Sequence, residues 1–127
     1  MDMRVAIYTK GVPGMTAKAQ EAELRRLCQQ RGWIAHKSYV DLPGSPKLAR
    51  GKERIALLDA LFRRRNQFGA VCVWRMSMLG NCSDDLLWVL NEIHVVRGIH
   101  IVAPGDGIDS TKDDSLKRVL KVLNQVE

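Results

Sequence analysis

The stretch Ala70-Val71-Cys72-Val73-Trp74 decides the fold that we expect for this chain. It is an uninterrupted apolar run, and such a run is typical of a strand that is buried on both faces of a parallel sheet. Amphipathic helical patterns flank it, over residues 53–65 before it and over residues 83–97 after it. We therefore predict a strand between two helices, which is the repeating unit of an α/β sheet.

The same alternation continues toward both ends of the chain. Strands are expected at residues 4–9, 33–40 and 99–103, and a helix at residues 17–31. A last helix is expected after Thr111-Lys112-Asp113-Asp114, which has the pattern of a capping box. The order β-α-β-α-β-α-β-α predicts a three-layer α/β fold with a mainly parallel sheet of four to five strands flanked by helices. The 127 residues fit a single domain.

Two helix ends carry further signals. Ser83 precedes Asp84 and Asp85, which predicts a hydroxyl cap followed by an acidic first turn. The run Arg63-Arg64-Arg65 falls where the helix over 53–65 should end, and cations in a last turn offset the helix dipole. The same arginines could instead contact phosphates.

Composition limits the class of protein. With 46% apolar residues, no apolar run of 18 residues and no charged-then-apolar leader, we expect a cytoplasmic protein without a membrane contact. The net charge of +6 favours contact with a polyanion but is also a common solubility margin. The cysteines form no C-x-x-C and the histidines have no metal-ligand spacing, so we predict reduced thiols and neither metal nor cofactor.

In a parallel sheet of this kind the active crevice lies at the carboxyl ends of the strands. Here these ends are the loops after Thr9, Val40, Trp74 and Ala103.

Three segments carry a resemblance to a known family, and two of them follow directly from these strands. They are Tyr8-Thr9-Lys10-Gly11-Val12, Arg54-Ile55-Ala56-Leu57, and the stretch from Trp74-Arg75-Met76 to Gly80-Asn81-Cys82. Their order, spacing and flanks resemble the N-terminal catalytic domain of the serine recombinases, the resolvases and invertases. The resemblance covers nearly the whole chain and implies a resolvase-like fold, DNA strand exchange without a cofactor, and a dimerising helix after residues 105–111. Because it ends where that family adds a DNA-reading domain, we expect a single domain over residues 1–127 with no C-terminal DNA-binding domain.

The chain departs from the family at the positions that carry the chemistry. The family reaction needs a serine nucleophile and arginines that balance charge on the phosphoryl oxygens. The residues at the family positions are Lys10 for an arginine, Val12 for the nucleophile, Ser77 for an aspartate, Met78 and Asn81 for two arginines, and a retained Arg54. We therefore predict a protein that is not an enzyme.

Three functions remain open. The first is an inactive resolvase-like domain that binds a recombinase or a second copy of itself in a mobile-element context, with Leu116, Val119, Leu120 and Leu123 as a helical seam; the same seam could pack on its own sheet. The second is an accessory factor that binds DNA without sequence preference. Its candidate cations are Lys10, Lys47, Arg50, Lys52, Arg54, Arg75 and the run 63–65. The third is an enzyme with a rewired nucleophile, for which Thr9, Thr16, Ser45, Ser77 and Cys82 are candidates.

Overall fold

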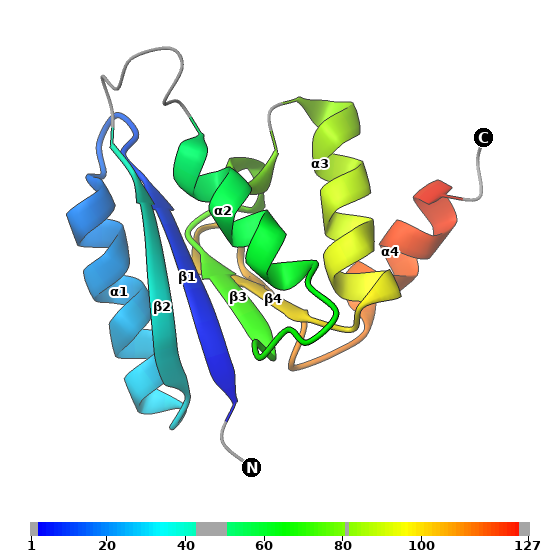
Figure 1. Cartoon of the computed structure of the whole chain (residues 1–127), viewed down its shortest axis with the longest axis horizontal. Coiled ribbons are helices and arrows are strands. Elements are labelled where there is room, and N and C mark those ends of the chain that lie inside the picture. Colours follow the sequence, from blue (N-terminus) through cyan, green and yellow to red (C-terminus); the bar gives the residue numbers. More distant parts are fainter. Residues whose placement is uncertain (1–2, 43–50, 81, 125–127) are drawn as a thin grey trace.

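A five-stranded sheet forms the middle layer of the computed structural model, which describes residues 3–42, 51–80 and 82–124 (Figure 1). The strand order is β2-β1-β3-β4-β5. Neighbouring strands among the first four are parallel, and the short β5 is antiparallel to β4. The strands are β1 (Arg4–Lys10), β2 (Ile34–Asp41), β3 (Ala70–Val73), β4 (His100–Ala103) and β5 (Ile108–Asp109). The expected mainly parallel sheet is confirmed.

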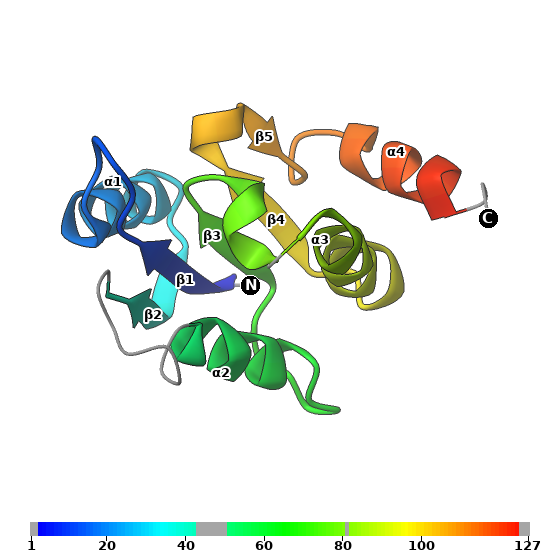
Figure 2. The same cartoon turned by 90° about the horizontal axis from the view of Figure 1, so that it is seen from above.

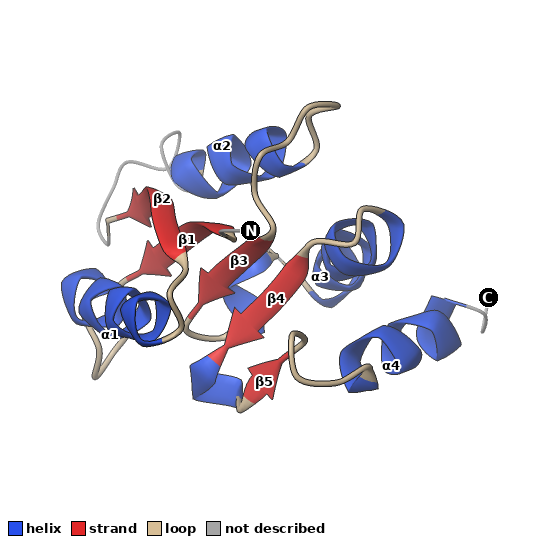
Figure 3. Cartoon of the chain, turned by 90° about the horizontal axis from the view of Figure 1, so that it is seen from below, coloured by secondary structure: helices blue, strands red, loops and turns tan. Residues whose placement is uncertain are grey.

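Helices cover both faces of the sheet. Figure 2 shows α1 on one side, α2 and α3 on the other, and α4 beside the edge formed by β4 and β5. Figure 3, which views the chain from below, shows α4 extending away from the sheet. The helices are α1 (Ala17–Gln30), α2 (Lys52–Leu61), α3 (Ser83–Leu90), which a π-helical segment (Asn91–Val96) continues, and α4 (Ser115–Asn124). Two 3₁₀ turns, Met76–Leu79 and Pro104–Asp106, follow β3 and β4.

The sheet separates two apolar cores. Because side chains alternate along a strand, Val5 and Ile7 of β1 pack toward α1, whereas Ala6 and Tyr8 pack toward α2 and α3. All four residues of β3 are fully buried, as expected for the run that begins at Ala70. Cys28 and Cys72 are buried and unbridged in the core under α1, whereas Cys82 is exposed.

The sequence predicted the end of α2 and the cap of α3 incorrectly. The helix α2 ends at Leu61, so the run Arg63-Arg64-Arg65 lies in the following turn and does not offset the dipole of the last helical turn. Ser83 is the first residue of α3, and Cys82 occupies the N-cap without a side-chain hydrogen bond. Asp84 and Asp85 do lie in the acidic first turn, as expected.

The capping box predicted before α4 is also wrong. The Thr111 hydroxyl donates to the Asp109 carboxylate, and the Ser115 backbone N–H donates to the Asp113 carboxylate at 2.8 Å. Local side-chain bonds of this kind compete with helix capping, because the same oxygens can serve either purpose.

No helix within the described residues is long and apolar enough to cross a membrane.

Candidate functional site

A cavity of about 360 Å³ opens at the carboxyl ends of the strands, where the sequence placed the crevice. The three segments predicted to meet there do line it. The end of β1 contributes Tyr8, Lys10 and Val12; the start of α2 contributes Gly51 and Arg54; the 3₁₀ turn after β3 contributes Ser77 and Met78, followed by Gly80. Parallel strands bring these distant segments to one edge of the sheet.

Arg54 is a buried cation in this cavity. Its Nη1 atom donates to the Leu79 carbonyl at 3.2 Å and lies 3.7 Å from the Asp85 carboxylate. The helix α2 and the turn after β3 therefore hold the guanidinium in one orientation. Part of its charge is already neutralised by the first turn of α3, which leaves less of it for a ligand.

Asp41 organises the start of α2 from the end of β2. Its carboxylate accepts the backbone N–H groups of Glu53 and Arg54, each at 3.0 Å, and the Tyr8 hydroxyl at 2.6 Å. Burial, and next the hydrogen bond to Asp41, raise the pKa of Tyr8 above its ordinary value. The Tyr8 hydroxyl therefore stays a protonated donor and is not available as a nucleophile.

The loop after β1 holds Val12 in a tight turn. Val12 and Met15 exchange two backbone hydrogen bonds of 3.1 and 3.0 Å around Pro13 and Gly14. Gly14 has a φ of +88°, a conformation that glycine adopts without strain and that a type II turn requires after proline. Val12 is 36% exposed and lines the cavity.

Gln20 fixes the same loop from α1. Although polar, it is fully buried, and its amide donates to the carbonyls of Lys10 and Met15 at 2.7 and 3.3 Å. Its side-chain oxygen accepts the Lys10 N–H at 3.3 Å. Sequence reasoning missed both Gln20 and Asp41. The signal for Asp41 was its place at a strand end, whereas Gln20 gave none beyond its position on a helix.

The 3₁₀ turn after β3 carries two more of the predicted site residues, Ser77 and Met78. Met78 is buried against the core, and Ser77 is exposed at the cavity. The turn is tied to Asp106, whose carboxylate accepts the Met76 N–H at 2.7 Å and lies 3.6 Å from the Arg75 guanidinium. Arg75 is thus paired with an acid and does not line the cavity.

The other predicted site residues are dispersed or outside the description. Lys52 is exposed at the start of α2 and does not line the cavity. Lys47, Arg50, Asn81 and Ser45 lie outside the described residues.

Of the alternative nucleophiles among the described residues, only Ser77 lines the cavity. Thr16 caps α1 by accepting the Ala19 N–H at 3.1 Å. Thr9 is fully buried and continues the side of β1 that carries Val5 and Ile7, which faces α1.

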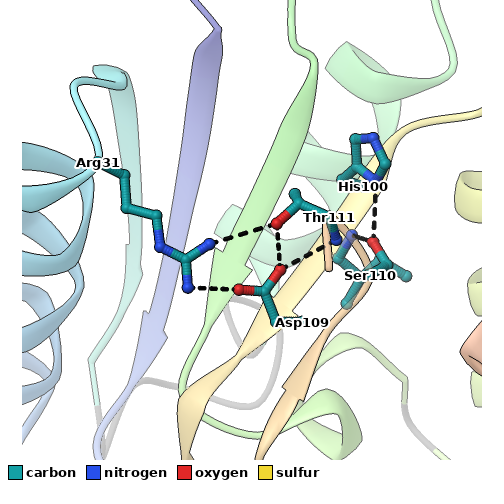
Figure 4. A network of polar contacts seen from close by, with 6 residues as sticks. Arg31, His100, Asp109, Ser110 and Thr111 are labelled. Carbon is teal, nitrogen blue, oxygen red and sulfur yellow. Dashed lines mark hydrogen bonds and ion pairs between the residues drawn. The ribbon is translucent and has the colours of Figure 1, made fainter. Parts of the chain in front are cut away.

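A second polar network joins α1 to the far edge of the sheet. Arg31 follows α1, forms an ion pair with Asp109 of β5, and donates to the Thr111 hydroxyl at 3.3 Å (Figure 4). Burial alone would raise the pKa of Asp109, but the hydrogen bonds from Thr111 and Arg31 outweigh it and lower this pKa. In the same network Ser110 contacts His100 Nδ1 at 3.1 Å.

Among the described residues, the histidines form no metal site with other ligands. The rings of His94 and His100 lie 5.9 Å apart, and no group of three or more His, Cys, Asp or Glu residues within 3–42, 51–80 and 82–124 could hold a metal ion. His94 contacts the Ile99 carbonyl through Nδ1 at 3.0 Å, which explains its burial as part of the fold.

Comparison with solved structures identifies the fold. The N-terminal catalytic domain of TP901-1 integrase superposes with a TM-score of 0.77 at 23% identity, covering 97% of this chain and 92% of that one. A resolvase family site-specific recombinase from Streptococcus pneumoniae also gives 0.77, at 21% identity, covering 98% and 87%. The C-terminal catalytic domain of ISC1926 TnpA, an IS607-like serine recombinase, gives 0.62 at 14% identity, covering 97% and 82%.

A search of curated proteins found no match to this sequence. The family model described as the resolvase N-terminal domain, in contrast, matches residues 4–127, which is nearly the whole chain. Together with the resolvase-like sheet and its crevice, this match shows that the chain belongs to the resolvase N-terminal domain family of serine recombinases.

Proposed function

We propose that this protein is a catalytically inactive member of its family that acts by binding another protein, and so regulates or accompanies site-specific DNA recombination in a mobile-element context. The observation that carries the proposal is the lining of the cavity at the carboxyl ends of the strands. Val12 and buried Met78 line this cavity, and by the sequence resemblance Val12 takes the place of the nucleophile and Met78 that of an arginine.

The chemistry of phosphoryl transfer explains why these two residues matter. A serine alkoxide must attack phosphorus, and the isopropyl group of Val12 has no lone pair for this step. Loss of one electrostatic stabiliser typically costs about 10² to 10³ in rate, and a thioether such as that of Met78 supplies no positive charge. Lys10 keeps a charge at the cavity, but an ammonium does not form the bidentate clamp of a guanidinium on phosphate.

Binding to a protein is supported by the apolar face of α4. Val119 is 54% exposed and Leu123 is 49% exposed, whereas Leu120 between them is buried in the core. Val119 and Leu116 also line a mostly apolar groove of about 360 Å³ against Met76 and Ile108. The partner is a second copy of this chain or an active recombinase.

Inactivity is tested with a covalent-adduct assay on supercoiled plasmid DNA that carries recombination sites. The wild-type chain should form no protein–DNA adduct, while an active serine recombinase on its own plasmid serves as the positive control. Val12→Ser alone should also form none, because an alkoxide at position 12 still lacks the arginine that Met78 replaces. An adduct with the wild-type chain would refute the proposal.

Protein binding is tested by size-exclusion chromatography with light scattering and by pull-down against a purified serine recombinase. A dimer or a stable complex is the expected result. A chain that stays monomeric and captures no recombinase counts against binding, whatever the adduct assay gives.

DNA binding without sequence preference is the second candidate. Lys10 is exposed at the cavity and forms no ion pair with a described residue, which leaves its charge available to a phosphate. A low-salt mobility shift of random duplex DNA that Lys10→Ser and Lys52→Ser together abolish would support this candidate; an unchanged shift would exclude these lysines. A rewired enzyme is less well supported, and Ser77→Ala in the adduct assay tests it.

A further inference from the structure

The ion pairs of this protein leave one group of arginines unneutralised. The arginines that pair with an acid are Arg25, Arg26, Arg31, Arg54, Arg75 and Arg97. In contrast, Arg118 of α4, Arg4 and the run Arg63-Arg64-Arg65 form no ion pair with any described residue. Arg63, Arg64 and Arg65 are exposed, and so is Arg4. Arg4 lies beside the run, because it donates a hydrogen bond to Gln67, two residues after Arg65.

A cavity of about 250 Å³ lies beside these arginines. Arg63 and Arg65 line it together with Lys37 of β2, and no carboxylate is among its lining residues in the part of the chain that is described. The Lys37 ammonium lies 4.9 Å from the centroid of the Tyr39 ring, which also lines the cavity. The ring face attracts the cation and so keeps the ammonium beside the cavity.

The loop that carries the arginines has a defined shape. Asn66 holds the backbone of Phe68 by two hydrogen bonds of 2.9 Å, one from its amide and one to its side-chain oxygen. The Arg63 carbonyl accepts the Asn66 N–H at 3.2 Å, and Gln67 accepts a hydrogen bond of 2.8 Å from Arg4. The cations are therefore displayed by an ordered turn that joins α2 to β3.

The arginine side of this cavity lies toward the end of the sheet opposite to the crevice, because the loop with Arg63 and Arg65 leads into the start of β3. Arg4 begins β1 and pairs with Ile34 at the start of β2, whereas Lys10 and Asp41 pair at the other end. Lys37 pairs with Ala6, four residues before Lys10, which is roughly 13 Å at about 3.3 Å per residue, and no described residue lines both cavities, so the two sites are distinct.

We propose that Arg63, Arg65 and Lys37, with Arg4 and Arg64 beside them, form a second binding site for the phosphate backbone of duplex DNA. A guanidinium group binds two phosphate oxygens at once. Because the DNA backbone carries a negative charge at every phosphate, several unpaired arginines on one ordered turn can each bind a phosphate of the same duplex. Contacts to phosphates alone do not read the bases, so binding at this site is independent of sequence. The inference rests neither on the inactivity of the crevice nor on protein binding through α4.

The experiment measures fluorescence anisotropy of a labelled random-sequence duplex across a range of salt concentrations. Three double variants each remove two positive charges from exposed positions. Arg63→Ser with Arg65→Ser tests the site, Arg25→Ser with Arg26→Ser removes ion-paired arginines of α1, and Lys10→Ser with Lys52→Ser tests the crevice side. Thermal unfolding followed by circular dichroism checks that each variant folds.

The 63/65 variant should bind at least about tenfold more weakly at low salt, and its salt slope should fall by about 2, one for each lost phosphate contact. The 25/26 variant should bind like the wild type. Equal weakening by all three variants would overturn the proposal in favour of diffuse charge, and an unchanged 63/65 variant would overturn it outright. Binding of a labelled polyglutamate peptide is measured in the same way. If this binding depends on Arg63 and Arg65 and binding of the duplex does not, the ligand of the site is an acidic protein and the proposal of DNA is wrong.

Discussion

The shape of the crevice depends most on Asp41. It joins the end of β2 to the first turn of α2 and to Tyr8 of β1. A carboxylate that accepts backbone N–H groups at a helix start stabilises that start, and Asp41 does so from outside the helix.

Asp41→Ala should therefore destabilise the fold by about 3 kcal/mol, since it removes a cap and leaves the buried Tyr8 hydroxyl without an acceptor. Tyr8→Phe, which removes only one of the three hydrogen bonds, should cost about 1 kcal/mol. Urea unfolding followed by tryptophan fluorescence measures both values. Equal costs for the two variants would show that the backbone contacts of Asp41 add nothing.

His94 gives the fold a dependence on acid pH. Burial lowers the pKa of His94 below its ordinary 6.5, although the hydrogen bond to Ile99 opposes this shift. The unfolded chain therefore takes up this proton more readily than the folded chain. The contribution of neutral His94 to the free energy of unfolding is therefore at its full value above about pH 6.5. It should decrease as the pH drops below 6.5, by at most about 1.4 kcal/mol per pH unit.

Urea unfolding at pH 7.5 and at pH 5 measures this dependence. His94→Gln should reduce the difference between the two pH values, while His36→Gln, at an exposed position, should leave it as in the wild type. A wild-type protein equally stable at both pH values would contradict the assignment.

At the scale of elements, α4 has the clearest unsatisfied surface. Its apolar positions Val119 and Leu123 are exposed on one stripe, and Arg118 lies on another side of the same helix. If α4 mediates the proposed contact, Val119→Glu with Leu123→Glu should convert a dimer to a monomer in light scattering. Arg118→Glu changes the net charge by the same amount and should leave the dimer intact.

Circular dichroism of these variants separates loss of contact from loss of structure. The glutamates favour helix, so the helical signal should persist in both proteins. A dimer that survives the 119/123 pair would move the interface to another surface.

The same elements show how far sequence reasoning reaches. The sheet followed from the apolar run at Ala70, because a strand buried on both faces leaves no polar positions to confuse the pattern. The end of α2 and the caps of α3 and α4 did not follow. Asn66 forms hydrogen bonds with the backbone of Phe68 in the turn after α2, and the Thr111 hydroxyl donates to Asp109. These side chains could cap a helix, but in this structure they stabilise the neighbouring turns.

The position of the crevice was predictable from the topology of the sheet, but the residues that hold its loops in place were not. Lys10, Val12 and Arg54 meet at one cavity because parallel strands end at one edge. Gln20 supports the loop from a helix ten residues away, and its role depends on burial that a polar residue on an amphipathic helix does not reveal.

At the scale of the whole molecule, the ion pair between Arg31 and Asp109 connects layers that are far apart in sequence. Arg31 follows α1 on one face, and Asp109 lies on the edge strand β5 that precedes α4 (Figure 4). The Arg31 guanidinium also lies 4.9 Å from the centroid of the Trp33 ring, which restricts its orientation. The pair therefore joins the end of α1 to the edge where α4 is attached.

A double-mutant cycle measures this connection. Arg31→Met and Asp109→Asn should each destabilise the fold by about 2 kcal/mol, less than for a fully buried pair because Arg31 keeps 26% of its side chain exposed. The double variant should cost less than the sum by about 1 kcal/mol, since each single change leaves a partner unpaired. Additive costs, measured by urea unfolding at pH 7, would show that the pair does not couple α1 to β5.

The lowered pKa of Asp109 adds a second check. The stabilisation of the fold by ionised Asp109 is present above the ordinary pKa of 3.8 and is lost as the pH falls below it. Arg31→Met should therefore flatten the loss of stability in acid.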